Sequence, residues 1–223
     1  MIGCLCIHGF TGGPYELEPL VQYLKKYTDW KIDLPCLPGH DNNSKLSSVS
    51  FKEWIEVAES KLVQLLNECD KIYLIGFSMG GMIASYLAAE YNVNKLVLLS
   101  PSRRYVSLKQ KSIDLGRDIK LGFLGKKPAR QPDRPKKSLI PVKAVGEFLK
   151  CMRFTRPALK QINCPVLIAQ GLQDGTVPYK STHYLDKEIP VRAEVLYFYD
   201  SKHHLCLGPD KEVLFEKVYL FLN

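Results

Sequence analysis

The sequence predicts an α/β protein with a mostly parallel sheet of about six strands, helices on both faces and one small insertion. Two observations support this prediction. Short apolar runs alternate with helical patterns along most of the 223 residues, and the hydrophobic content of 46% is enough for one well-buried core. The alternation lapses only between about residues 103 and 160. We therefore expect a core of residues 1–102 and 161–223, with an inserted lid at 103–160.

The N-terminal part of the core carries four of the expected strands. Short runs of β-branched, leucine and aromatic residues predict strands, whereas longer segments with an apolar residue every three or four positions predict helices. In chain order, the patterns predict a strand at 2–7, a helix at 15–26, a strand at 31–34, a helix at 51–67, a strand at 71–76, a helix at 79–91 and a strand at 95–99.

The segment that follows has a different composition. Gly, Pro and basic residues dominate positions 125–137, which is typical of a surface loop and not of a sheet. The regular alternation then resumes with a strand at 166–170, a helix near 179–188, a strand at 193–199 and a final helix from about 210 to 222. The lid prediction depends on this interruption.

One strand runs directly into a glycine-rich turn that carries a serine. The motif is Gly76-Phe77-Ser78-Met79-Gly80, preceded by an apolar run and followed by small apolar residues suited to packing on a sheet. Glycines two positions before and after the serine remove Cβ atoms that would collide in a tight strand-to-helix turn. The pattern predicts that Ser78 is a nucleophile whose hydroxyl is lifted above the sheet.

A serine hydroxyl needs a base to take its proton and a carboxylate to orient that base. Asp174 follows the predicted strand 166–170, and His203 and His204 follow the strand 193–199. Because parallel strands bring their carboxyl ends to one edge of a sheet, we expect these side chains to converge on Ser78. The non-catalytic alternatives are that Asp174 only forms a turn before Gly175, and that His203 and His204 are a solvent-exposed pair in a loop.

A tetrahedral intermediate also needs two amide donors for its oxyanion. The first candidate is the backbone N–H of Met79, directly after the nucleophile. The second is the backbone N–H of Phe10, in the glycine-rich loop after the first strand. His8 in this loop precedes the nucleophile, and we interpret it as a hydrogen-bonding brace and not as the base.

The net charge of +8 is concentrated in one segment. Residues 103–160 hold 17 Lys and Arg against four acids, a net charge of +13, while the rest of the chain carries −5. The basic segment lacks aromatic interleaving and any recognisable nucleic-acid motif, so we expect no nucleic-acid partner. Two interpretations remain for it: a solvated surface, or weak attraction to anionic lipid surfaces or acidic substrates.

The cysteines and the N-terminus indicate a cytoplasmic protein. The seven cysteines are scattered without a Cys-x-x-Cys pair, which predicts reduced thiols in the core. No stretch of eighteen apolar residues occurs, and the first nine residues lack the basic flank and cleavage site of a signal peptide.

Together these motifs resemble the α/β-hydrolase superfamily, and more closely the small carboxylesterases and monoacylglycerol lipase-like esterases of bacilli. The resemblance covers nearly the whole chain. It rests on His8-Gly9-Phe10-Thr11-Gly12, on Pro38-Gly39-His40 followed by Trp54, on Gly76-Phe77-Ser78-Met79-Gly80-Gly81, on Gly171-x-x-Asp174 and on Ser201-x-His203. The family's catalytic histidine follows Ser-x, which favours His203 and leaves His204 as the alternative.

The resemblance implies a serine hydrolase without cofactor or metal, acting on small-molecule carboxylic esters. Short or medium acyl chains and monoglycerides are the implied substrates. It also implies a small helical lid between the strands ending near Leu99 and beginning near Val166. Because the chain starts at the strand before the oxyanion loop, we expect the first antiparallel strands of larger relatives to be absent.

Other functions use the same residues. A thioesterase, an amidase or a C–C hydrolase would need the same triad, and a non-catalytic binding scaffold would need none of it. Apolar residues of the lid are candidates for an acyl pocket or for the lid's own core: Leu121, Phe123, Leu124, Phe148, Leu149 and Met152. The oligomeric state is left open.

Overall fold

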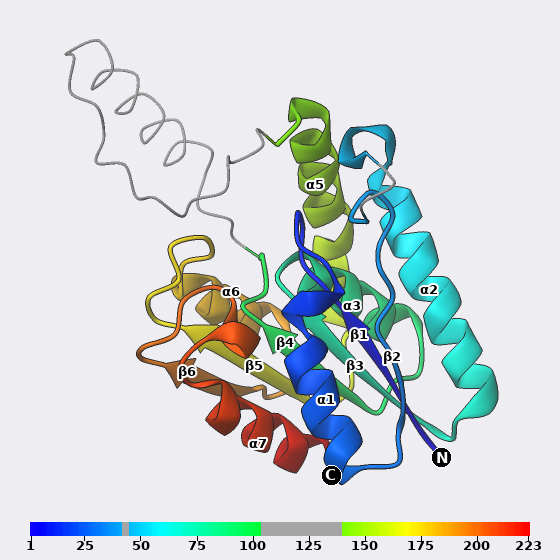
Figure 1. Cartoon of the computed structure of the whole chain (residues 1–223), viewed down its shortest axis with the longest axis vertical. Coiled ribbons are helices and arrows are strands. Elements are labelled where there is room, and N and C mark those ends of the chain that lie inside the picture. Colours follow the sequence, from blue (N-terminus) through cyan, green and yellow to red (C-terminus); the bar gives the residue numbers. More distant parts are fainter. Residues whose placement is uncertain (42–44, 104–139) are drawn as a thin grey trace.

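The computed structural model describes residues 1–41, 45–103 and 140–223. Its centre is a six-stranded sheet in the order β2-β1-β3-β4-β5-β6, in which every neighbouring pair is parallel (Figure 1). The strands are β1 (Ile2–Ile7), β2 (Lys31–Asp33), β3 (Lys71–Phe77), β4 (Lys95–Leu99), β5 (Val166–Gly171) and β6 (Glu194–Phe198). The predicted parallel sheet of about six strands is confirmed.

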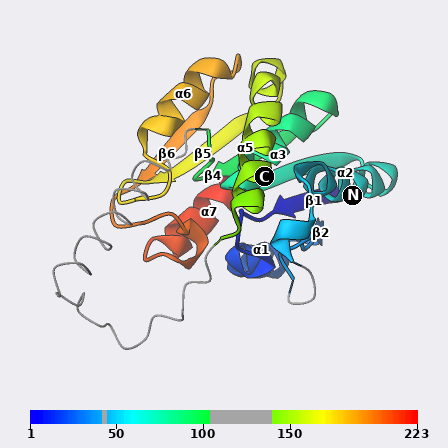
Figure 2. The same ribbon diagram turned by 90° about the horizontal axis from the view of Figure 1, so that it is seen from above.

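Helices cover both faces of the sheet (Figure 2). One face is covered by α1 (Glu18–Tyr27) and α7 (Lys211–Leu222), which contribute to a first buried cluster. The other face is covered by α2 (Phe51–Glu68), α3 (Met79–Glu90), α5 (Val142–Thr155) and α6 (Lys180–Glu188), which contribute to a second. Side chains alternate along β1, so that Cys4 packs in the first cluster and Leu5 in the second. Because the central strands are buried on both faces, their sequences are continuously apolar.

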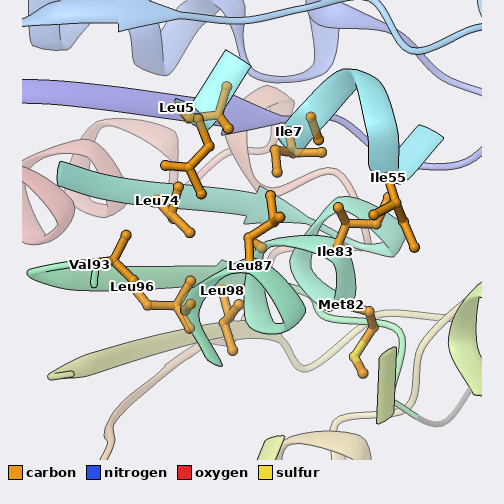
Figure 3. Packing of buried hydrophobic residues seen from close by; sticks show 14 of the residues in the cluster. Leu5, Ile7, Ile55, Leu74, Met82, Ile83, Leu87, Val93, Leu96 and Leu98 are labelled. Atoms are coloured by element: carbon orange, nitrogen blue, oxygen red, sulfur yellow. The ribbon is translucent and has the colours of Figure 1, made fainter. Parts of the chain in front are cut away.

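The helix that carries the glycine-rich motif is itself almost wholly buried. Leu87 of α3 lies near Leu74 of β3 and Leu98 of β4, and Ile83 lies beside Ile55 of α2 (Figure 3). On its outer side, α3 contacts α5 and a 3-10 helix at Arg156–Gln161. Packing on all sides fixes α3, and with it the turn at its N-terminus.

The first helix begins later than its pattern predicts. Residues Pro14–Glu16 form a separate 3-10 turn, and α1 begins at Glu18. Proline lacks an N–H and fits only the first turn of a helix, so Pro14 and Pro19 each mark a helix start. One predicted helix is therefore two short elements.

The predicted lid is described only in part. Residues 104–139 lie outside the described residues, and the remainder, from Ile140, forms α5 and the 3-10 helix Arg156–Gln161. Phe148 and Cys151 of α5 belong to the same buried cluster as α2 and α3. At residue 103, the Nε atom of Arg103 donates to a carboxylate oxygen of Glu188 in α6 at 2.6 Å. The division of the chain into core and lid stays a prediction.

All seven cysteines are free, and five of them are buried: Cys4, Cys6, Cys151, Cys164 and Cys206. The expectation of core thiols holds for these five, while Cys36 is exposed and Cys69 half-buried. Across the three described stretches, no helix combines the length and the apolar character needed to cross a membrane.

Candidate active site

Ser78 sits in a strained turn between β3 and α3. Its backbone has φ 53° and ψ −113°, a left-handed conformation that non-glycine residues rarely adopt. A Cβ atom on Gly76 would lie 2.4 Å from the carbonyl oxygen of Gly80, and one on Gly80 would lie 2.1 Å from that of Ile7. Both positions therefore require glycine, which is the physical reason for the spacing of the motif.

Three side chains from the ends of three strands form one hydrogen-bonded chain. The Oγ atom of Ser78, after β3, lies 3.0 Å from Nε2 of His203, after β6. Nδ1 of His203 lies 2.7 Å from Oδ2 of Asp174, after β5. The Asp174 side chain is fully buried and that of His203 is 12% exposed. The three side chains thus converge at the carboxyl edge of the sheet, as the positions of the strand ends predict.

Asp174 is held by several donors. Its Oδ1 accepts from the backbone N–H groups of Thr176 and Val177 at 2.7 and 2.8 Å, and its Oδ2 also accepts from Nε2 of Gln170 at 3.0 Å. Burial by itself would raise the pKa of Asp174, but the hydrogen bond and charge of His203 together with the two backbone donors lower it. The carboxylate is therefore ionised and able to stabilise a protonated imidazole.

Ser102, which the sequence analysis missed, touches the nucleophile. Its buried hydroxyl lies 2.9 Å from Oγ of Ser78, and its backbone N–H donates to the Ser78 carbonyl. Because ionised Asp174 can only accept, Nδ1 of His203 carries a proton and Nε2 accepts from Ser78. The Ser102 hydroxyl must then donate to the Ser78 oxygen, which keeps that oxygen directed toward His203.

His204 points elsewhere. Its Nδ1 lies 3.4 Å from Oε1 of Glu16, and its side chain is 50% exposed. Burial lowers its pKa, and the neighbouring His203 lowers it further. Of the two histidines left open by the residues alone, the structure brings His203 and not His204 into hydrogen-bond contact with Ser78 among the described contacts.

The loop after β1 lies beside the nucleophile. A Cβ atom on Gly80 would meet the carbonyls of Ile7 and His8, so the start of α3 and the end of β1 are in close contact. Met79 is the first residue of α3, where backbone N–H groups have no partner within the helix. This arrangement favours Met79 and Phe10 as oxyanion donors, and those roles stay predictions.

His8 braces the same loop, as its position suggested. Its Nε2 accepts from the backbone N–H of Leu37 at 2.9 Å, and its Nδ1 lies 2.9 Å from the carbonyl oxygen of Gly9. The side chain is buried, and burial lowers its pKa to about 4. His8 is therefore neutral near pH 7 and links the loop to the segment after β2.

A cavity of about 190 Å³ opens onto Ser78 and His203. Phe10 and Phe148 stack within it at a ring-centroid distance of 4.9 Å and form an apolar wall. Of the other apolar candidates from the lid segment, Leu149 is 44% exposed and Met152 packs against the core. Leu121, Phe123 and Leu124 lie outside the described residues.

The cavity also holds Glu16, a second residue that sequence reasoning missed. Its side chain is 2% exposed, and burial raises its pKa to about 6, although the Gly9 N–H and the charge of His203 oppose the shift. Its signal in the sequence was an acid next to the glycine-rich loop. In the described part of the chain, no group of three His, Cys, Asp or Glu side chains could hold a metal ion.

Comparisons with known proteins place this geometry in context. The family described as alpha/beta hydrolase fold matches residues 5–125. A thermostable monoacylglycerol lipase of Bacillus sp. strain H-257 is 25% identical over 97% of this chain and 88% of its own length. A pimeloyl-(acyl-carrier protein) methyl ester esterase of Aliivibrio salmonicida is 24% identical over 86% of this chain and 81% of its own length.

Two solved structures share the fold over almost the whole chain. One comes from work on LipS and LipT, two metagenome-derived lipolytic enzymes, with a TM-score of 0.80, 23% identity and coverage of 99% of this chain and 92% of that one. The other is a monoacylglycerol lipase of Paleococcus ferrophilus, with a TM-score of 0.75, 20% identity and coverage of 99% and 93%.

Proposed function

This chain belongs to the alpha/beta hydrolase fold family, and from that premise we propose that it is a serine esterase that cleaves carboxylic esters through an acyl-enzyme on Ser78. The observation that carries the proposal is the hydrogen-bonded chain from Asp174 through His203 to Ser78. The order of the contacts supports the proposal, because one ring nitrogen of His203 faces the Ser78 hydroxyl and the other faces the Asp174 carboxylate, as proton transfer from a serine requires.

The reaction follows from these contacts. Ser78 attacks the ester carbonyl while Nε2 of His203 takes the hydroxyl proton, and the bond to the alcohol breaks as His203 returns that proton to it. The amides of Met79 and Phe10 stabilise the oxyanion in both half-reactions. A water molecule, deprotonated by His203, then releases the acid and restores Ser78.

The proposed substrates are esters with short or medium acyl chains, including monoacylglycerols. The apolar wall of Phe10 and Phe148 suits an alkyl chain, and about 190 Å³ is small for a ligand site. The similarity to a monoacylglycerol lipase along nearly the full chain supports the same class. A panel of p-nitrophenyl esters of increasing chain length, with monoacylglycerols, thioesters and anilides, ranks these substrates against one another.

The direct test is Ser78→Ala. We expect this variant to fold and to lose p-nitrophenyl ester hydrolysis and labelling by a fluorophosphonate, since no other described residue has this arrangement. Turnover retained by Ser78→Ala would refute the nucleophile. A wild-type protein that neither hydrolyses the panel nor takes the label would instead support the non-catalytic scaffold.

The basic segment is proposed to give weak attraction to anionic lipid surfaces. In the described part of this segment, three of the positive charges are already paired: Arg103 and Arg156 with Glu188, and Lys150 with Glu147. These pairs reduce the charge that is left to attract a lipid surface. Co-sedimentation with vesicles is expected to be greater for anionic than for neutral lipid at low salt. Equal binding to both would dispose of the idea. The cytoplasmic location stays a prediction.

A further inference from the structure

Glu16, which lines the cavity, takes no part in the proton transfer described above. Residues 9–13, here called the oxyanion loop because they include Phe10, pack directly against its carboxylate. The Oε2 atom of Glu16 accepts the backbone N–H of Gly9 at 2.9 Å. The backbone N–H of Gly13 also favours the charged form of this carboxylate and lowers its pKa. Through the hydrogen bond to Gly9 and the close contact with Gly12, Glu16 spans residues 9–13, the loop that carries Phe10.

Part of this arrangement resembles a helix cap. Glu16 is the third residue of the 3-10 turn Pro14–Glu16, whose N-cap is Gly13, and an acid at that position commonly accepts the N-cap amide. The contact with Gly9, seven residues earlier, goes beyond a cap. It ties the turn to the residue directly before Phe10.

The loop also leaves no room between itself and the carboxylate. A Cβ atom on Gly12 would lie 2.1 Å from Cδ of Glu16 and 2.2 Å from each of its oxygens. Thr11, between Phe10 and Gly12, has φ 63°, an unfavourable conformation that the surrounding contacts must hold in place. Glycine at position 12 and glutamate at position 16 are therefore coupled by direct contact.

We propose that Glu16 is a positioning residue for the oxyanion loop, whose carboxylate holds residues 9–13 so that the Phe10 amide faces the reacting carbonyl. The inference rests on the proposed function and adds to it a residue outside the triad. A buried carboxylate is costly, and the hydrogen bond from the Gly9 N–H compensates only in part. Its placement at the loop that supplies the oxyanion donor gives this cost a catalytic purpose.

The test uses Glu16→Ala, Glu16→Gln, Gly12→Ala and the double variant Gly12→Ala/Glu16→Ala, with p-nitrophenyl butyrate as substrate. Losing one oxyanion donor lowers kcat by about 10² to 10³. We expect kcat to fall by about 100-fold in Glu16→Ala with KM little changed, because the donor acts on the transition state. Glu16→Gln keeps one acceptor and should recover part of the activity, to about tenfold below wild type.

The double variant separates positioning from general damage. Gly12→Ala alone should be about as harmful as Glu16→Ala, since its Cβ displaces the carboxylate. In the Glu16→Ala background that space is empty, so the added methyl group should lower kcat by less than about threefold. If the two effects multiply instead, the coupling is absent and the inference is wrong.

A matched control is Glu147→Gln. Glu147 is also a mostly buried acid that accepts a backbone N–H, that of Phe51 at 3.1 Å, but it joins α5 to α2. We expect Glu147→Gln to lower the thermal midpoint and keep wild-type kcat. Wild-type kcat in Glu16→Ala would overturn the inference alone, whereas the absence of any turnover by the wild-type protein would remove the proposed function.

Discussion

Two loops at the carboxyl edge of the sheet each hold a buried acid, and they treat it in opposite ways. In the loop after β5, the pKa of Asp174 is lowered despite burial, because His203 and two backbone N–H groups favour the charged form. In the loop after β1, burial outweighs the donors and raises the pKa of Glu16 to about 6. His8 in that same loop is also shifted toward its neutral form.

The contrast shows that burial alone does not decide the charge of a carboxyl group. Asp174 has two backbone donors, the amide of Gln170 and an imidazole that gains a proton during catalysis. Glu16 accepts one backbone N–H, that of Gly9, and otherwise has the nearby Gly13 amide and the partly exposed His204. The loop after β5 favours a fully charged Asp174, which can stabilise a protonated imidazole. The loop after β1 does not favour a charged Glu16, and there the carboxyl group serves to hold the backbone in its conformation.

The largest expected effect that tests this contrast is that of Asp174→Asn. The asparagine amide keeps the size of the side chain, but it favours the wrong tautomer of His203 and cannot stabilise its protonated form. We expect kcat to fall about 10⁴-fold, measured in steady state on p-nitrophenyl butyrate. The isosteric change Glu16→Gln should cost about tenfold. Similar losses in the two variants would show that the acids do not differ in role.

His8 should dominate acid destabilisation of the loop after β1. Its folded pKa of about 4 lies below the unfolded value of 6.5, so its contribution is complete above pH 6.5 and is lost as the pH falls through 4. The shift corresponds to about 3 kcal/mol of unfolding free energy. Urea unfolding at pH 7.5 and 4.5 measures it, and His8→Gln should flatten the difference; an equally steep dependence in the variant would exclude His8.

Glu16 should show the opposite sign. Its folded pKa of about 6 lies above the ordinary 4.5, so its contribution is complete below pH 4.5 and is lost as the pH rises through 6. Tyr15, His203, His204 and Cys206 are the titratable groups that face it.

Glu16→Gln is accordingly expected to be more stable than wild type at pH 8, by up to about 2 kcal/mol, while it is the slower enzyme. Urea unfolding at pH 8 and pH 5 gives both values. A variant less stable than wild type at pH 8 would contradict the raised pKa.

Ser102 lies in neither loop. Replacing it measures how much one hydrogen bond between neutral groups at the nucleophile contributes to kcat. Ser102→Ala removes the donor to the Ser78 oxygen, and one such bond corresponds to about a tenfold loss in kcat at most. Ser102→Thr keeps the hydroxyl and serves as the conservative variant. The rate of fluorophosphonate labelling should fall in parallel with kcat in the alanine variant; unchanged rates in both assays would mean that Ser78 needs no second partner.

The smallest effect is expected at His204. It contacts Glu16 and not Ser78, so His204→Gln should change kcat by less than about threefold, since the contact is a partly exposed one. His203→Gln, measured beside it, should resemble Asp174→Asn or be worse. A large loss at His204 would identify it as a second functional histidine and link the two loops.

The sequence predicted what depends on strand ends and tight turns. Ser78, Asp174 and His203 each follow a strongly apolar strand, and parallel topology brings such positions to one edge without further information. Gly76 and Gly80 could be predicted equally well, because glycine is required there by steric clashes within the turn itself.

Glu16 and Ser102 could not be found in this way. Glu16 lies in a 3-10 turn whose direction depends on Pro14, and the pattern merged that turn into a longer helix. Ser102 comes two residues after buried Ser100, whose backbone has the unusual φ of 44°, and its contact with Ser78 is seen only once this loop is folded. Both roles arise from loops that fold back on the sheet, and hydrophobic periodicity carries no information about them.

The placement of Arg103 and Ile140 has a consequence for how such proteins diverge. Arg103 pairs with Glu188 and directly follows Ser102, which contacts Ser78, and Ile140 lines the cavity, so both residues lie close to the reacting serine. Substitutions at Ile140 and Phe148, which both line the cavity, can reshape it during evolution, while the residues that perform the chemistry lie on other segments and stay unchanged.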